Sequence, residues 1–267
     1  MKKYLSLFNI SLQQEFAYRL NFIMWRVRNV IQVLLVFFLW DSIFSDPDKV
    51  VFGYNRASIL TYVFGILIVR AFVLSARAVD VAGEVSSGDL SNYLVKPIDY
   101  FKYWFTRDIS SKVLNFVFAI VETVLLFLIL KPPFFLQTNP LYLLGFIISI
   151  ALAMFIFFVI LFITSAIPFW MPEVAWGAQF IVIMIITEFL SGALFPIDIL
   201  PQTFQNILYM LPFPYLIFFP LQVYLGKLGA MEIFRGLSIS LFWAVSLWFL
   251  MKMIWGKGLK VYQAFGR

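Results

Sequence analysis

The sequence predicts an all-α integral membrane protein with six transmembrane helices, and three observations carry this prediction. Of its 267 residues, 63% are hydrophobic and only 13% are charged, whereas a soluble domain carries about 25% charged residues. The mean hydropathy is +0.93, so lipid must surround much of the surface. The apolar runs are continuous and about 20 residues long, which favours helices over the alternating strands of a membrane barrel.

Six apolar runs are long enough to cross the hydrocarbon core of a bilayer. No polar stretch between them is long enough for a soluble domain, so residues 1–267 are predicted to form a single transmembrane domain. Proline-containing segments such as Lys131-Pro132-Pro133 break the helical pattern between runs. The predicted spans are Phe22–Phe44, Ser58–Ala76, Val113–Leu130, Leu141–Ile167, Ala178–Leu194 and Ile233–Met253.

Residues 2–20 have the pattern of an amphipathic helix. Apolar side chains recur at every fourth position, and polar side chains lie off that stripe. Such a helix tends to lie in the membrane interface, although the segment could also be the exposed start of the first span. The stripe consists of Tyr4, Phe8, Leu12, Phe16 and Leu20.

Residues 195–229, between the fifth and sixth spans, are apolar enough to suggest a seventh span. Pro212, Pro214 and Pro220 oppose a regular helix there. Six spans with a cytoplasmic N-terminus also place 14 of the 20 basic residues inside and five outside, with Arg70 within the second span, as the positive-inside rule requires. We therefore expect short helices that enter the outer leaflet and return.

The longest polar stretch, residues 77–112, is predicted to be a cytoplasmic loop that contains short helices. Gly88 and Pro97 bracket about two helical turns, for which Asp89 is the expected N-cap, and Asp99 is expected to cap the next helix. Leu90, Tyr93 and Leu94 then share an apolar face. Such a face needs a cover, which could be the membrane surface or a groove of a partner protein.

Three ionisable residues fall within the predicted spans: Arg70 in the second, Glu122 in the third and Glu188 in the fifth. A charge at the bilayer centre costs about 2.5 kcal/mol or more, so each is expected to face protein or a water-filled cavity. They could line a substrate pathway. They could equally form an ion pair between helices, such as Arg70 with Glu122, that fixes packing.

The predicted outer region is rich in helix breakers. Irregular backbone at membrane depth is tolerated where protein buries it or where it lines a cavity. This region could gate an exit on the outer face or could serve only as a structural cap. The residues that mark it are Gly192, Pro196, Pro201, Pro212 and Pro214.

The composition excludes several kinds of site. With no Cys and no His, the chain has no disulfide, no thiolate or imidazole metal ligand and no His general base. No phosphate-binding loop or nucleophile motif is found, so we expect no catalytic residue, no metal site and no cofactor on this chain. The net charge of +6 is better explained by topology and anionic lipid than by nucleic acid.

Three segments resemble the ABC-2 type permeases, the transmembrane subunits of bacterial ABC exporters. The first is Ser87-Gly-Asp-Leu followed by Leu94-Val-Lys-Pro97, downstream of Glu84. The second is Ser191-Gly-Ala-Leu-Phe-Pro-Ile-Asp-Ile-Leu-Pro201, followed by Leu211-Pro-Phe-Pro-Tyr215. The third is the tail from Trp255 to Gly266, which resembles a subgroup that includes drug- and viologen-export permeases.

The resemblance implies a permease in the bacterial plasma membrane, with both termini cytoplasmic, that moves a hydrophobic or amphipathic substrate outward. Two permease chains, identical or related, would pair in the lipid bilayer. Each would receive a separate cytosolic ATPase that binds ATP and Mg²⁺. The segment from Glu84 and Gly88 to Pro97 would be the coupling helix that docks in that ATPase. A stand-alone secondary carrier or lipid scramblase is the alternative, and a membrane-embedded enzyme is a third.

Overall fold

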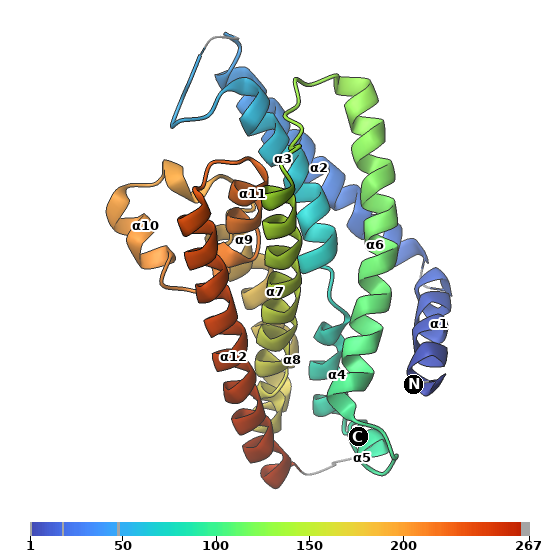
Figure 1. Cartoon of the computed structure of the whole chain (residues 1–267). Coiled ribbons are helices and arrows are strands. Elements are labelled where there is room, and N and C mark those ends of the chain that lie inside the picture. Colours follow the sequence, from blue (N-terminus) through green and yellow to red (C-terminus); the bar gives the residue numbers. More distant parts are fainter. Residues whose placement is uncertain (1, 18, 47–48, 263–267) are drawn as a thin grey trace.

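The structure is a computed structural model that describes residues 2–17, 19–46 and 49–262, which form a bundle of helices (Figure 1). Across these residues no strand is present, and an isolated bridge joins Val51 and Tyr54. Six helices in this part of the chain are long and apolar enough to cross a membrane. The predicted all-α membrane fold with six spans is therefore confirmed.

Each span except the fifth is built on a single long helix, and the fifth is assembled from shorter pieces. The long helices are α2 (Arg19–Ile43), α3 (Arg56–Val73), α6 (Tyr100–Leu130), α7 (Pro140–Thr164) and α12 (Ala230–Val261). The fifth span, Pro172–Leu190, consists of a 3₁₀ turn (Pro172–Val174), α8 (Ala175–Phe180), a π-helical segment (Ile181–Ile186) and α9 (Thr187–Leu190). The remaining helices are α1 (Lys2–Ala17), α4 (Asp80–Ser87), α5 (Ser91–Leu94), α10 (Gln202–Leu208) and α11 (Phe218–Tyr224).

Helix α6 joins the helix predicted to start at Asp99 to the third span, which was predicted to start at Val113. Asp99 caps it, since its carboxylate accepts a hydrogen bond from the backbone N–H of Lys102 at 3.0 Å, as predicted. The helix then continues unbroken to Leu130, so the polar stretch up to Lys112 is not a loop. The prediction was wrong here because polarity was read as exposure, whereas Asp108 and Lys112 are buried against other elements.

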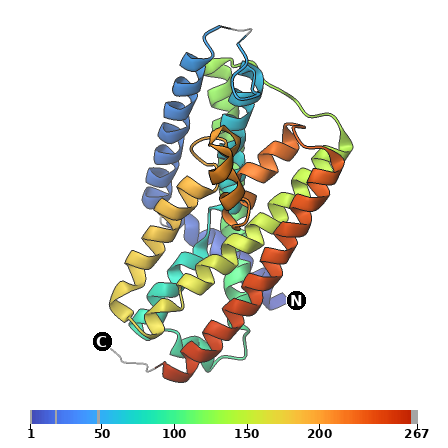
Figure 2. The same cartoon turned by 90° about the vertical axis from the view of Figure 1, so that its left-hand side faces the viewer.

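The core of the bundle is built around α7, which packs on α12, α11 and α3. Helices α7 and α12 lie side by side along much of their length (Figure 2). Close approach depends on Gly258 of α12, where a Cβ would stand 2.2 Å from the ring of Phe169. Nearby, the indole N–H of Trp255 donates to the carbonyl oxygen of Phe162 at 2.8 Å. These contacts fix α12 to α7 near the end of the bundle where α5 lies.

The fifth span ends beside the middle of α3. The hydroxyl of Tyr62, in the first half of α3, donates to the carbonyl oxygen of Gly192 at 2.7 Å. Glu188 pairs with Arg70, in the last turn of α3. The chain after Gly192 therefore continues beside the first half of α3. There α11 is buried and packs on α7 and α3, an arrangement compatible with the predicted re-entrant region.

Helix α1 packs along α6 (Figure 1). The hydroxyl of Ser110 on α6 donates to the carbonyl oxygen of Phe8 at 3.1 Å. Tyr4, Phe8 and Leu12 of the predicted stripe are partly buried, whereas the side chains of Phe16 and Leu20 lie outside the described residues. The placement of α1 at the membrane interface stays a prediction.

Candidate functional site

The segment between α4 and α6 forms one tip of the bundle (Figure 1). Helix α4 ends at Gly88, whose φ of +86° suits glycine best. The single turn α5 follows and brings Leu94 and Val95 to the surface, where they are 51% and 84% exposed. We call residues 84–97 the tip segment. Its end therefore presents two neighbouring aliphatic side chains with no cover from the described chain.

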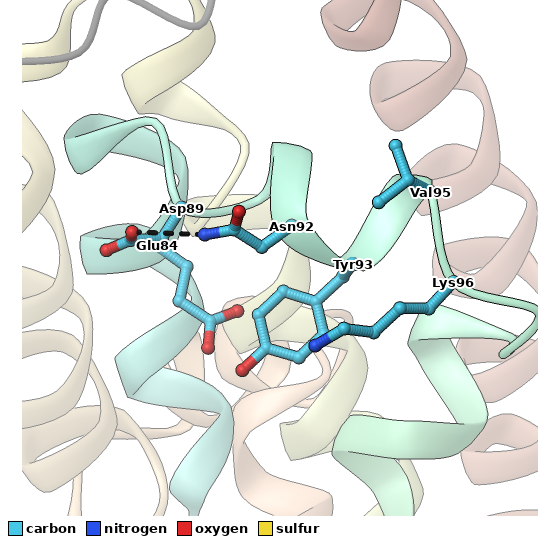
Figure 3. Close-up of a pocket in the computed structure, with 6 residues that line it drawn as sticks. All are labelled: Glu84, Asp89, Asn92, Tyr93, Val95 and Lys96. Atoms are coloured by element: carbon cyan, nitrogen blue, oxygen red, sulfur yellow. Dashed lines mark hydrogen bonds between the residues drawn. The ribbon is translucent and has the colours of Figure 1, made fainter.

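A pocket of about 480 Å³ lies beside Val95 (Figure 3). Glu84 and Lys96 bring opposite charges to its wall, and the Lys96 ammonium lies 5.1 Å from the centroid of the Tyr93 ring. The Asp89 carboxylate accepts hydrogen bonds from the Ser87 hydroxyl at 2.7 Å and from the Asn92 amide at 3.5 Å. The pocket thus holds two carboxylates and one ammonium next to an exposed apolar edge. Its lining is Glu84, Asp89, Asn92, Tyr93, Val95 and Lys96.

Two details of the predicted tip segment were wrong. Leu90 is fully buried, so the predicted shared face of Leu90, Tyr93 and Leu94 is split, and only Leu94 offers a largely exposed side chain. Leu90, rather than Asp89, is the residue that precedes α5, and it makes no side-chain cap. The Asp89 side chain bonds to other side chains instead, because the backbone N–H groups of Ser91 and Asn92 already donate to the carbonyl oxygens of Gly88 and Asp89.

Glu84 ties the tip segment to α6. Its carboxylate accepts hydrogen bonds from the Tyr100 hydroxyl at 2.6 Å and from the Trp104 indole N–H at 3.2 Å. Burial raises the pKa of the Glu84 carboxyl, while these hydrogen bonds act in the opposite direction. Glu84 is therefore a structural link as well as a pocket residue.

Further polar contacts connect the base of the tip segment to α1. The Arg77 guanidinium pairs with the Glu15 carboxylate of α1 and with Asp80, the latter at 3.4 Å. Arg107 of α6 donates to the side-chain oxygen of Gln14 at 3.2 Å. Burial raises the pKa of the Asp80 carboxyl, against the influence of Arg77. Sequence reasoning missed the two partners on α1 because they are 62 and 93 residues away in the chain.

A closed ion pair lies where α3 meets α6. The Lys112 ammonium is 3.2 Å from the Asp108 carboxylate, and both side chains are almost completely buried. Lys112 also donates to the carbonyl oxygens of Val73 and Ser75, at 3.2 and 2.6 Å, while the backbone N–H of Arg77 donates to Asp108 at 2.9 Å. The i, i+4 spacing of Asp108 and Lys112 was the available signal. This pair fixes the end of α3 against α6.

Within the spans, Glu122 of α6 pairs with Arg26 of α2. The Arg26 Nε–H donates to Glu122 Oε1 at 2.7 Å, and a second guanidinium nitrogen approaches the other carboxylate oxygen. Both side chains are largely buried. The suggested pair of Arg70 with Glu122 is thus wrong, because Arg26 supplies Glu122 with a two-point partner.

Glu188 lies in a larger cluster that three elements build. Arg70 of α3 donates to one Glu188 oxygen at 3.0 Å and pairs with the other. From α2, the Gln32 amide donates to Glu188 Oε2 at 3.2 Å, and the Arg28 guanidinium lies 3.9 Å from Oε1. We call Arg28, Gln32, Arg70 and Glu188 the Glu188 cluster. It contains two arginines and one carboxylate.

At the opposite end of the bundle, a polar cluster links the loop before α3 to residues 195–229. The Asp198 carboxylate accepts hydrogen bonds from the Tyr54 hydroxyl at 2.9 Å and from the Gln222 amide at 3.0 Å. The Lys227 ammonium is 3.6 Å from Asp198, and burial lowers its pKa although Asp198 raises it. These contacts hold the loop, η5 (Ile197–Ile199) and α11 together.

The helix breakers of this region sit where short helices start. Pro196, Pro201 and Pro212 each occupy the N-cap position of a short helix, and Pro214 lies in the first turn of Phe213–Tyr215, where a missing backbone N–H costs nothing. Gly192 adopts a φ of +83°, and a Cβ there would stand 2.8 Å from both the Tyr62 hydroxyl and Phe218 Cβ. The predicted breaks in regular helix therefore occur at these residues. The role of the region, as an exit gate or as a structural cap, stays a prediction.

No group of three or more metal-ligating side chains occurs among the described residues. The family model for ABC-2 family transporter proteins matches residues 30–266, which include the tip segment, the Glu188 cluster apart from Arg28, and residues 195–229. A search of curated proteins returns no match. The chain is a multi-pass membrane protein, and it belongs to the ABC-2 family of transporter proteins.

Proposed function

We propose that this chain is the permease subunit of an ATP-driven exporter and that a separate cytosolic ATPase docks on the tip segment. The observation that carries the proposal is the exposed pair Leu94 and Val95 at the end of a segment that buried polar contacts tie to α1 and α6. A partner groove with apolar walls would cover this pair. Basic side chains of the partner would find Glu84 and Asp89 in the adjoining pocket.

Movement of the ATPase could reach the spans through the same contacts. The tip segment joins α6 through Glu84, and its base joins α1 through Arg77 and Glu15. Closure of two ATPase subunits around ATP and Mg²⁺ would displace this rigid unit and bias the membrane helices between two arrangements. ATP and Mg²⁺ bind on the partner in this proposal, and this chain contributes no nucleotide site.

The remaining parts of the proposal concern assembly and direction. Two permease chains, identical or related, pair in the bacterial plasma membrane with their termini in the cytoplasm, where most basic residues lie. A hydrophobic or amphipathic substrate moves outward between them and leaves beneath residues 195–229. The polar cluster around Asp198, which joins the loop before α3 to α11, is suited to keep that region closed at rest.

Purification of the tagged chain from its native membrane in a mild detergent tests the first part. A stoichiometric ATP-binding subunit in the eluate is the expected result, and a second permease in the eluate would establish a heterodimer. A chain that repeatedly elutes without an ATPase would overturn the proposal in favour of a stand-alone carrier or scramblase.

The docking surface is tested by replacing its two exposed side chains together, Leu94→Glu with Val95→Glu. We expect at least a tenfold loss of copurified ATPase, since buried carboxylates without partners oppose association by about 1.4 kcal/mol or more. The amount of permease in the membrane should not change, because neither residue belongs to the core. Val50→Glu is the matched control, since Val50 is also exposed but lies in the loop before α3, next to the bridge between Val51 and Tyr54. Full ATPase recovery with the double variant would refute this docking site.

A further inference from the structure

Arg28 is the exceptional member of the Glu188 cluster. Its side chain is 40% exposed, whereas Arg70 and Glu188 are about one-tenth exposed. Within the described part of the chain its guanidinium donates no hydrogen bond, and its nearest carboxylate oxygen is 3.9 Å away. Arginine carries five N–H donors in a planar fork. These donors therefore have no hydrogen-bond acceptor among the described residues.

The carboxylate beside Arg28 is already engaged. Glu188 pairs through both oxygens with Arg70 and accepts a further hydrogen bond from Gln32. The facing groups from α2, α3 and α9 thus comprise two guanidinium groups, one carboxylate and one neutral amide. Arg26, two residues before Arg28, is held by Glu122 and does not alter this balance. One positive charge in the cluster remains without a full partner.

Exposed apolar side chains lie on the helices that build the Glu188 cluster. The Arg28 guanidinium lies 5.0 Å from the centroid of the Trp25 ring, within the range of a cation–π contact. Trp25 and Ile31 on α2 are exposed, as are Ile185 and Phe189 on either side of Glu188. A π-helical segment, a feature frequent at functional sites, leads directly into α9.

We propose that Arg28, at the edge of the Glu188 cluster, binds the anionic headgroup of an amphiphile, and that Trp25 and the exposed apolar side chains of α2 and α9 receive its tail. The headgroup is a phosphate or a carboxylate, because both accept the two parallel hydrogen bonds of a guanidinium fork. This inference rests on the proposed function and sharpens it, since it gives the cargo a negative charge.

Binding of dodecyl phosphate to the purified full-length chain in an uncharged maltoside detergent provides the test. We expect Arg28→Gln to weaken binding by about 10- to 100-fold, the equivalent of losing one hydrogen-bonded charge contact. The affinity of Arg28→Lys for dodecyl phosphate should lie between those of the wild type and Arg28→Gln, because lysine keeps the charge but not the planar fork of donors. Arg56→Gln is the matched control and should bind normally, since Arg56 is 34% exposed but is paired with Asp41 at 2.8 Å.

Two further ligands test whether binding requires both a net negative charge and an apolar tail. Dodecyl phosphocholine, whose headgroup is neutral overall, and inorganic phosphate, which has no tail, should each bind at least tenfold more weakly than dodecyl phosphate. Equal binding of dodecyl phosphate by the wild type, Arg28→Gln and Arg28→Lys would overturn the proposal. So would absence of binding together with a loss of chain–chain association in Arg28→Gln, because the anion would then come from a second copy.

Membrane lipid and transported cargo offer the same headgroup chemistry, and nanodiscs separate them. If phosphatidylglycerol in the disc weakens dodecyl phosphate binding in proportion to its fraction, membrane lipid occupies the site. If binding is the same as in phosphatidylcholine discs, the site selects a separate amphiphile. Both results support the anion site and identify its source. None of these assays contains the ATPase, so their outcome is independent of the copurification test.

Discussion

The Asp108–Lys112 pair and the Glu188 cluster both place charge inside the bundle, but one is closed and the other is open. Asp108 and Lys112 form a one-to-one pair, and backbone groups of residues 73–77 supply further partners. In the Glu188 cluster two arginines share one carboxylate, and Arg28 remains partly exposed. A closed pair fixes two helices against each other, whereas an open cluster retains capacity for another anion.

The difference has a physical basis in desolvation. A buried ion pair offers little net stability relative to apolar residues, but removal of one partner leaves an uncompensated charge. Loss of either member of a closed pair therefore leaves the other charge buried and unpaired. In the open cluster the most exposed charge can be removed at low cost, because Glu188 keeps Arg70 and Gln32 as partners. This contrast predicts how variants at the two places should differ.

The largest effect is expected for Lys112→Met, which leaves the Asp108 carboxylate buried without its cation. The variant should lose about 3–5 kcal/mol of folding stability. The double variant Asp108→Asn with Lys112→Met should recover most of that loss, since the amide oxygen of the new side chain can still accept the hydrogen bond from the backbone. Unfolding midpoints in mixed micelles measure the folding stability of the single and the double variant.

Lys102→Met is the control for this experiment. Lys102 lies on the same helix and is 4.0 Å from Asp99, but its side chain is exposed, so its loss should cost under about 1 kcal/mol. If the single and double variants at Lys112 were equally unstable, the description of a closed pair would be incorrect.

Arg28→Gln should cost much less than Arg70→Gln, and this difference defines the open cluster. We expect a loss of under about 1 kcal/mol for Arg28→Gln, as for other partly exposed ion pairs. Arg70→Gln removes the two-point partner of a buried carboxylate, so its cost should approach about 3 kcal/mol. The same unfolding measurement compares them. Equal losses would mean that Arg28 is a structural residue and would remove the physical basis for a guanidinium that is free to bind an anion.

The fold was largely predictable from the sequence because a bilayer imposes strong constraints. Long apolar runs, the proline breaks and the Asp99 cap each depend on local sequence, and each was identified correctly. The burial of Asp108 and Lys112 on α6 was missed, because a polar residue can be buried when a specific partner satisfies it. Hydropathy alone does not detect such partners.

The candidate sites were less predictable because they depend on contacts between distant residues. The sequence located Glu122 and Glu188 as buried acids, but their partners are Arg26 and Arg70, 96 and 118 residues away. Spacing also suggested that Leu90 and Leu94 share a face, as they would in a longer helix. The turn at Gly88 and the shortness of α5 instead direct Leu90 into the core.

Glu84 is intermediate between the two kinds of site, and its pH response gives the smallest predicted effect. It is hydrogen-bonded on one side and lines the pocket on the other. Burial raises the pKa of its carboxyl, so just above the ordinary Glu value of about 4.3 the folded chain holds a proton that the unfolded chain releases. This contribution to stability is complete below that value and is lost as pH rises through the folded-state pKa.

Relative to Glu84→Gln, the wild type should therefore lose melting temperature as pH rises from about 4 to 7. Asn92→Ala changes the same pocket without a titrating group and should follow the wild type. Parallel profiles for the wild type and Glu84→Gln would show that the Tyr100 and Trp104 hydrogen bonds fully offset the effect of burial and that Glu84 belongs with the closed contacts.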